Sequence, residues 1–336
     1  MSLIRVILIG IGPIGFACAR AVRADRAMDL VGLVDTDENK IGKTLDELGG
    51  RTDSTVAGPK VTGDLGEALK TDADVAIITT SSQFDKVYPT IRKCIERGLA
   101  VVSSCEQMIW PWYRHASLAD QLDAAAKHAN CAVLGTGVNP GFVMDSLAVS
   151  LSTMVRRVDS IRCVRKVDAS LRRGSLQMKI GATLKREQFE DLAKARQIGH
   201  QGIGESVAML GAGLGVHVEP GSVHETLEPV IAEKAIPSAL GLIEPGAVCG
   251  IHNIAKWEGD GPRIELDLTM AVGQTNAMDK IIVQGPVQLH IKIPGAIPGD
   301  SATVGVMVNH VRIVANARPG LLTMLDVPIA GCRGRD

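Results

Sequence analysis

A single carboxylate, Glu106, follows an apolar run, Leu99 to Val102, that is typical of a buried parallel strand. The stretch after that run, SSCEQMIWPW (103–112), is otherwise made of small, apolar and aromatic residues. Ligands of open α/β sheets bind beyond the carboxyl ends of the strands, which is where Glu106 falls. A partly desolvated carboxylate there suits a cationic intermediate, because it can stabilise an iminium or ammonium and exchange a proton with water. Glu106 is therefore predicted to be catalytic, the alternative being a surface glutamate that caps the following helix.

The neighbouring Cys105 suggests a second chemistry, a thiolate nucleophile. No histidine adjoins it in the sequence to activate it, and cysteines in buried strands are usually inert. Glu106 is the preferred candidate.

A glycine-rich loop opens the chain in VILIGIGPIG (6–15), which carries G-x-G-x-x-G at Gly10, Gly12 and Gly15 between a strand and a helix. The first glycine permits a tight turn, the second lets the backbone approach a pyrophosphate, and the third allows close packing of helix and strand. The helix N-terminus, with Pro13 and Ile14, then presents N–H groups to the phosphates. The loop is predicted to bind a dinucleotide.

An acidic residue, Asp35, ends the second strand about twenty residues further on, where a ribose hydroxyl is held in such sites. Its charge repels a 2′-phosphate, which favours NAD over NADP, but Lys40 and Lys43 follow closely and soften the discrimination. After the next core strand, Thr80 and Ser81 in TTSS (79–82) offer hydroxyls to the far ribose, or form only a turn.

The elements that must position these residues are continuous apolar runs separated by helical stretches through the first 140 residues. Such strands, apolar without alternation, indicate a parallel sheet covered on both faces, and right-handed crossovers give a doubly wound Rossmann-type sheet. The runs are IRVILIG, DLVGLVD, DVAIITT, LAVVSS and CAVLGTG.

A second pattern begins after about residue 140, with helical segments near 144–154, 186–198 and 205–214, and then alternating strands. This pattern predicts an α+β domain with mostly antiparallel strands over 141–301, following a dinucleotide-binding domain over 1–140. The stretch RRVDSIRCVRKVDASLRR (156–173) indicates a solvated strand pair and its turn, or an anion site. The segment 302–336 begins with a helix that ends before Pro319 and is expected to pack on the first domain.

The composition excludes several classes of protein. The net charge of −1 argues against nucleic acid or an anionic membrane as the main partner, and no run is long and apolar enough to span a bilayer. Seven cysteines without a CxxC pair, and histidines without metal spacing, predict reduced thiols in a cytoplasmic protein and no metal site. The first twenty residues could pass for a signal peptide, but the glycine spacing favours a structural strand.

Five stretches together resemble the 2,4-diaminopentanoate dehydrogenase family, which is close to NAD(P)-dependent amine dehydrogenases and related to dihydrodipicolinate reductase. The resemblance covers nearly the whole chain, and the Glu and NPGF blocks are its most specific parts. It implies a Rossmann domain, a second domain for substrate binding and homodimerisation, and reversible oxidative deamination with NAD or NADP. The stretches are SSCEQMIWPW, GTGVNPGFVMDSLAVSLS, RKVDASLRRGSLQMKIGA, IGHQGIGES and NARPGLLTMLDVPIAG.

The resemblance also implies roles for residues. The catalytic glutamate of the family falls on Glu106, Asn139 falls close to the nicotinamide, and Phe142 and Met144 fall nearer the substrate. The histidine pair of dihydrodipicolinate reductase is absent from VRKVDASLRRG (164–174), which disfavours reduction of a cyclic dicarboxylate.

The resemblance implies a small amine, diamino acid or ketone as the substrate, with ammonia as co-substrate. A diamino acid needs a carboxylate anchor, for which the candidates are Arg165, Lys166 and Arg172, although Arg165 and Lys166 could instead form a solvated face. A simple amine needs an apolar pocket, which Trp110, Phe142 and Met144 could supply. His200 either lines that pocket or ends a helix. The rivals are a reductase of a preformed imine or enamine and a non-catalytic NAD-binding sensor.

Overall fold

Parallel strands form the sheet of the first unit in the computed structural model, which describes residues 3–49 and 58–332. The chain divides into two compact units: unit 1, Met1–Phe142 with Pro298–Asp336, and unit 2, Val143–Ile297. The sheet of unit 1 has the order β15-β6-β5-β4-β1-β2-β3, and every pairing is parallel. This order confirms the predicted doubly wound Rossmann-type sheet. Its strands are β1 (Ile4–Ile9), β2 (Met28–Val34), β3 (Val61–Thr62), β4 (Val75–Ile78), β5 (Ala100–Ser103), β6 (Ala132–Gly135) and β15 (Gly320–Leu322).

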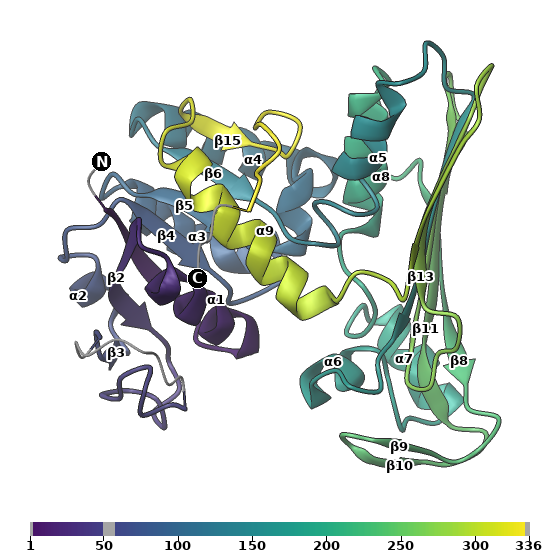
Figure 1. Cartoon of the computed structure of the whole chain (residues 1–336), viewed down its shortest axis with the longest axis horizontal. Coiled ribbons are helices and arrows are strands. Elements are labelled where there is room, and N and C mark those ends of the chain that lie inside the picture. Colours follow the sequence, from purple (N-terminus) through teal and green to yellow (C-terminus); the bar gives the residue numbers. More distant parts are fainter. Residues whose placement is uncertain (1–2, 50–57, 333–336) are drawn as a thin grey trace. The chain divides into compact units, whose positions relative to one another are not determined.

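Helices cover this sheet in two pairs (Figure 1). Helix α1 (Pro13–Ala24) packs against α9 (Gly299–Val314), and α3 (Phe84–Ile95) packs against α4 (Trp112–His128); a short α2 (Leu65–Ala68) lies beside β2 and β3. The apolar residues of α3 recur at helical spacing and are buried in one core cluster with β4 and β5, so this face of the helix holds it on the sheet.

The C-terminal segment contributes a helix and a strand to unit 1. The sequence places the boundaries at residues 140 and 301, whereas the compact units change at 142 and 297. Helix α9 contacts α1 and β5, and the guanidinium of Arg312 binds the carboxylate of Asp25 at 2.6 Å. Strand β15, which the sequence did not predict, extends the sheet beside β6.

Unit 2 contains a six-stranded sheet of order β14-β13-β7-β12-β11-β8, which is antiparallel except between β7 and β12. Helix α8 packs on β11 and β12. The other helices of the unit are α5, α6 and α7, and a hairpin, β9 and β10, is separate from the main sheet. The elements are α5 (Ser146–Ser152), β7 (Ser160–Asp168), α6 (Gly174–Lys179), α7 (Arg186–Lys194), α8 (Ile203–Gly213), β8 (His224–Ile231), β9 (Ile236–Ser238), β10 (Gly241–Ile243), β11 (Val248–Trp257), β12 (Arg263–Ala271), β13 (Met278–Gln284) and β14 (Leu289–Pro294).

The basic stretch 156–173 is not a strand pair, which corrects the sequence prediction. It contains one strand, β7, between β12 and β13 near the middle of the sheet. Buried side chains at Ile161, Cys163 and Arg165 alternate with side chains on the other face, and no turn interrupts them before Asp168. Among residues 3–49 and 58–332, no helix combines the length and apolar character needed to cross a bilayer.

Candidate coenzyme and catalytic site

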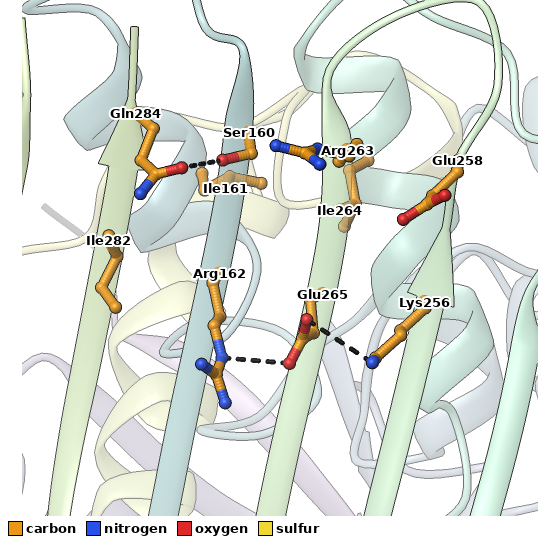
Figure 2. Close-up of a pocket in the computed structure, with 10 residues that line it drawn as sticks. All are labelled: Ser160, Ile161, Arg162, Lys256, Glu258, Arg263, Ile264, Glu265, Ile282 and Gln284. Carbon is orange, nitrogen blue, oxygen red and sulfur yellow. Dashed lines mark hydrogen bonds and ion pairs between the residues drawn. The ribbon is translucent and has the colours of Figure 1, made fainter.

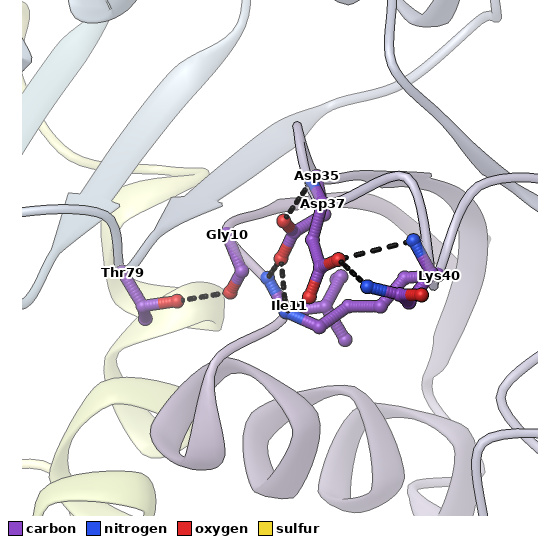
Figure 3. Close-up of polar contacts among 7 residues, drawn as sticks. Gly10, Ile11, Asp35, Asp37, Lys40 and Thr79 are labelled. Carbon is purple, nitrogen blue, oxygen red and sulfur yellow. Dashed lines mark hydrogen bonds and ion pairs between the residues drawn. The ribbon is translucent and has the colours of Figure 1, made fainter. Parts of the chain in front are cut away.

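The loop between β1 and α1 has no room for side chains at two of its glycines. Gly10 has φ of +94°, and a Cβ on Gly15 would lie 1.8 Å from the carbonyl oxygen of Gly10. The hydroxyl of Thr79, just after β4, donates to that same oxygen at 2.6 Å (Figure 3). Only glycine at both positions lets α1 begin this close to β1.

Gly12 has the opposite surroundings, because a Cβ there would meet no atom within 4 Å. It is the N-cap residue of α1, no side chain caps that end, and Pro13 opens the helix ahead of Ile14. The N–H groups of the first turn have no partners inside the helix. Open space beside a positive helix end fits a pyrophosphate, so the residues present suit a dinucleotide.

Asp35, just after β2, is already held by three donors (Figure 3). Its carboxylate accepts from the backbone N–H of Ile11 at 2.7 Å, the N–H of Asp37 at 2.9 Å and the ammonium of Lys40 at 3.0 Å. Burial by itself would raise the pKa of Asp35, but these three hydrogen bonds and the charge of Lys40 hold it below its usual value. The carboxylate is thus ionised, fixed against the glycine loop and paired with a cation.

Lys40 is shared between two carboxylates, since its Nζ lies 3.0 Å from Asp35 and 3.4 Å from Asp37. Burial lowers the pKa of Lys40, but the two carboxylates more than offset this and hold it above its ordinary value. One positive charge therefore stands beside the position predicted to meet the ribose.

The loop after β4 lies beside the glycine loop. The methyl of Thr80 would be 2.8 Å from a Cβ on Gly10, so this residue closes one side of the turn. The hydroxyl oxygen of Ser81 accepts from the N–H of Gln83 at 3.1 Å. Thr80 and Ser81 lie at the same carboxyl edge of the sheet as the glycine loop. Their contacts with the coenzyme stay predictions.

Glu106 is half-buried and begins η1 (Glu106–Ile109), a 3-10 turn that follows β5. The hydroxyl of Ser82 donates to its Oε1 at 3.0 Å. Because β4 and β5 are parallel neighbours, the loops after them meet at one edge, and this hydrogen bond joins them. The carboxylate is thereby held at the sheet edge that carries the glycine loop.

Cys105, the alternative nucleophile, is fully buried in the core cluster with β4, β5 and α3. A substrate cannot reach a thiol inside a packed core, so the structure gives this alternative no support.

The loop after β6 carries Asn139 at the same edge of the sheet. Asn139 is half-buried, and it precedes Gly141, whose φ is +126°. A Cβ on Gly141 would lie 2.6 Å from the backbone nitrogen of Gly137, which explains the glycine of the NPGF block. Contact of Asn139 with the nicotinamide stays a prediction.

The predicted substrate residues fall in both units. Trp110 and Phe142 are half-buried residues of unit 1, and the Trp110 ring lies 5.6 Å from that of Trp112. Met144 is buried in unit 2, and His200 is half-buried in the loop before α8. Their contact with substrate stays a prediction.

Arg165 has a structural partner inside unit 2. It is 2% exposed, its guanidinium binds the carboxylate of Asp279 at 2.5 Å, and it donates to the carbonyl oxygen of Ile297 at 2.8 Å. The other oxygen of Asp279 accepts from the N–H of Ile297 at 2.7 Å. These contacts explain how the charged Arg165 side chain can be buried without a bound ligand. They speak against its predicted role as a substrate anchor.

Sequence reasoning missed three residues around Glu106, namely Ser82, Gln107 and His115. Ser82 ends the stretch TTSS (79–82), and its place after the neighbouring strand is a signal that it meets the Glu106 loop. Nothing in a single sequence indicates that Gln107 and His115 lie near each other, because their contact depends on the 3-10 turn η1 and on a kink in α4.

Comparison with known proteins gives consistent matches. The sequence profile of the 2,4-diaminopentanoate dehydrogenase C-terminal domain matches residues 142–335. The chain is 28% identical to a 2,4-diaminopentanoate dehydrogenase of Acetoanaerobium sticklandii, with 98% of this chain and 94% of the relative covered. It is 23% identical to an amine dehydrogenase of Streptomyces virginiae, with 99% and 98% covered. The solved amine dehydrogenase of Mycobacterium smegmatis superposes with a TM-score of 0.88 at 25% identity, covering 99% and 98%.

Proposed function

The chain belongs to the family defined by the 2,4-diaminopentanoate dehydrogenase C-terminal domain, and from this premise we propose that it is an NAD(P)-dependent amine dehydrogenase. The reaction is the reversible oxidative deamination of an amine or diamino acid, or in reverse the reductive amination of a carbonyl with ammonia. The observation that carries the proposal is the placement of Glu106, held by Ser82 at the sheet edge that bears the glycine loop. We also propose a cytoplasmic location, because the seven cysteines are scattered through the sequence without a CxxC pair.

Glu106 is proposed to have three roles in the reaction. When bound, the coenzyme supplies or accepts the hydride. The ionised carboxylate of Glu106 holds ammonium, takes and returns the proton as the carbinolamine loses water, and stabilises the positive charge on the substrate nitrogen. Glu106 is half-buried, so the field of its carboxylate is screened less than that of a fully exposed one.

A substrate screen tests the proposal. We expect NADH oxidation that depends on ammonia with a ketone or aldehyde, or NAD reduction with 2,4-diaminopentanoate. A reductase of a preformed imine would oxidise NADH without free ammonia, and a non-catalytic sensor would bind NADH and turn over nothing; either result contradicts the proposal. The substrate contacts predicted for Trp110 and Phe142 of unit 1, and separately for Met144 and His200 of unit 2, are part of this proposal.

Lys40 is expected to set the coenzyme preference. Exchange of Lys40 for methionine removes the cation that balances Asp35, so the carboxylate repels a 2′-phosphate more strongly while its oxygen becomes available to ribose hydroxyls. We expect the ratio of the Kd for NADPH to the Kd for NADH to rise about tenfold, the value of one charge-assisted hydrogen bond. Fluorescence titration of each coenzyme measures the ratio, and exposed Lys93 in the last turn of α3, changed to methionine, is the matched control. An unchanged ratio of the two Kd values would show that Lys40 has no part in the coenzyme preference.

The homodimer is proposed to form through the sheet face of unit 2 that carries a shallow pocket of mixed charge (Figure 2). On this face Glu265 of β12 lies between Arg162 of β7, at 3.0 Å, and Lys256 of β11, at 3.9 Å. Arg263 and Glu258 are exposed in the same pocket, and neither has an ion pair within the described part of the chain. In a dimer with a two-fold axis, Arg263 of one protomer can face Glu258 of the partner subunit, and symmetry forms the same pair a second time.

Charge reversal tests this face. We expect Arg263→Glu to weaken the dimer at least tenfold in light scattering coupled to gel filtration, because it places like charges together. Adding Glu258→Arg to that variant restores opposite charges and should restore the dimer. If the single variant assembles like the unaltered protein, the dimer uses another surface.

A further inference from the structure

The side chain of Gln107, next to Glu106, joins three segments of unit 1. Its Oε1 accepts from the backbone N–H of Phe84 at 2.8 Å and from Nε2 of His115 at 3.2 Å. Its own backbone N–H donates to the carbonyl oxygen of Ser82 at 3.3 Å. The turn that carries Glu106 is thus tied to the loop after β4 and to helix α4.

These contacts fix the orientation of both side chains. The Phe84 N–H belongs to the first turn of α3, where no helical partner exists, and the N-cap residue Gln83 supplies no side-chain cap. A backbone N–H needs an acceptor, so the amide of Gln107 must present its oxygen there. Because that oxygen also faces His115, the imidazole must carry its proton on Nε2 and donate.

His115 reaches Gln107 through a local distortion of α4. Its backbone angles, φ −135° and ψ 45°, are non-helical inside the helix. The ring packs edge-on against Phe84, with centroids 5.8 Å apart and planes at 68°. The one residue of α4 with non-helical backbone angles is thus the residue whose imidazole contacts Gln107.

From this geometry we propose that His115 is a positioning residue for the reaction: through Gln107 it holds the turn that presents Glu106. The chain of contacts runs from the His115 ring to the Gln107 amide, and from the backbone of the same turn to Ser82, which binds Glu106 directly. Without the ring, one donor to Gln107 is lost and η1 gains freedom relative to the loop after β4. The inference rests on the proposed role of Glu106.

Two substitutions and a control test it. His115→Leu keeps an apolar contact with Phe84 but removes the donor, whereas His115→Gln retains an N–H donor three bonds from Cβ, as in histidine. The control is His128→Leu, at the exposed end of the same helix. We expect His115→Leu to lower kcat about 10- to 100-fold, the cost of a small misplacement of a catalytic group, with the Kd for NADH within twofold. His115→Gln should recover most of that loss, and the control should match the unaltered enzyme.

The outcomes separate this inference from the function on which it rests. Unchanged kcat in His115→Leu, alongside an inactive Glu106→Gln, overturns the positioning role and leaves the proposed function standing. Full activity in Glu106→Gln overturns the proposed role of the carboxylate itself. If His115→Leu does not fold, Gln107→Met, which removes the acceptor instead of the donor, decides: an unchanged kcat overturns the inference, and a loss of about 10- to 100-fold with the Kd for NADH within twofold supports it.

Discussion

Replacement of Glu106 by glutamine is expected to lower kcat for amination about 10²- to 10⁴-fold, the range that general acid–base groups contribute. The amide keeps the shape of the side chain and can still accept from Ser82, so the turn stays in place. What is lost is the negative charge that holds ammonium and the basic oxygen that takes the proton. The Kd for NADH, measured by fluorescence titration, should stay within twofold, because the glycine loop and Asp35 are untouched.

A matched control is Glu96→Gln, at the exposed C-cap of α3 in the same unit. It removes the same charge at the end of α3 opposite to Phe84, whose N–H contacts the turn of Glu106, and it should leave kcat unchanged. Near-normal turnover in Glu106→Gln, with the control unaffected, would show that the carboxylate is not in the reaction and would leave only a coenzyme-binding scaffold.

The parallel sheet and the glycine loop were predictable because their signals are local. Continuous apolar runs mark buried strands, and Gly10 and Gly15 are forced by contacts within one strand–loop–helix unit. The family assignment made from short motifs was confirmed by the match over residues 142–335. The contact of Glu106 with Ser82 has only an indirect signal in the sequence, namely that each residue follows one of two neighbouring strands. The hydrogen bond itself spans 24 residues and exists only once β4 and β5 pair.

Arg165 shows a second limit of sequence reasoning. A basic residue in a charged stretch suggests a solvated face or an anion site, yet the alternation of β7 turns Arg165 to the buried face. Its partner, Asp279, comes from β13, more than a hundred residues later. Burial lowers the pKa of the Arg165 guanidinium, an effect that the nearby charge and hydrogen bond of Asp279 partly offset.

Removing the charge of either Arg165 or Asp279 is expected to lower the stability of the fold. Arg165→Met leaves the carboxylate of Asp279 buried without its cation, and Asp279→Asn leaves the guanidinium without its anion. Each should lower the free energy of unfolding by about 3–5 kcal/mol, the usual result of uncompensated buried charge. Urea unfolding followed by far-UV circular dichroism measures the change. Arg157→Met breaks the exposed pair with Asp159 in the same unit and should change stability by no more than about 0.5 kcal/mol.

The same variants decide between a structural and a substrate-binding Arg165. A structural pair predicts that Arg165→Met combined with Asp279→Leu costs less than the sum of the two single changes, since neither charge is then left alone. The backbone N–H and carbonyl of Ile297 still lose their partners, so the double variant should not reach full stability. If instead Arg165→Met unfolds like the unaltered protein and only raises KM for a carboxylate-bearing substrate, then Arg165 is the substrate anchor, and its bond to Asp279 contributes little to the fold.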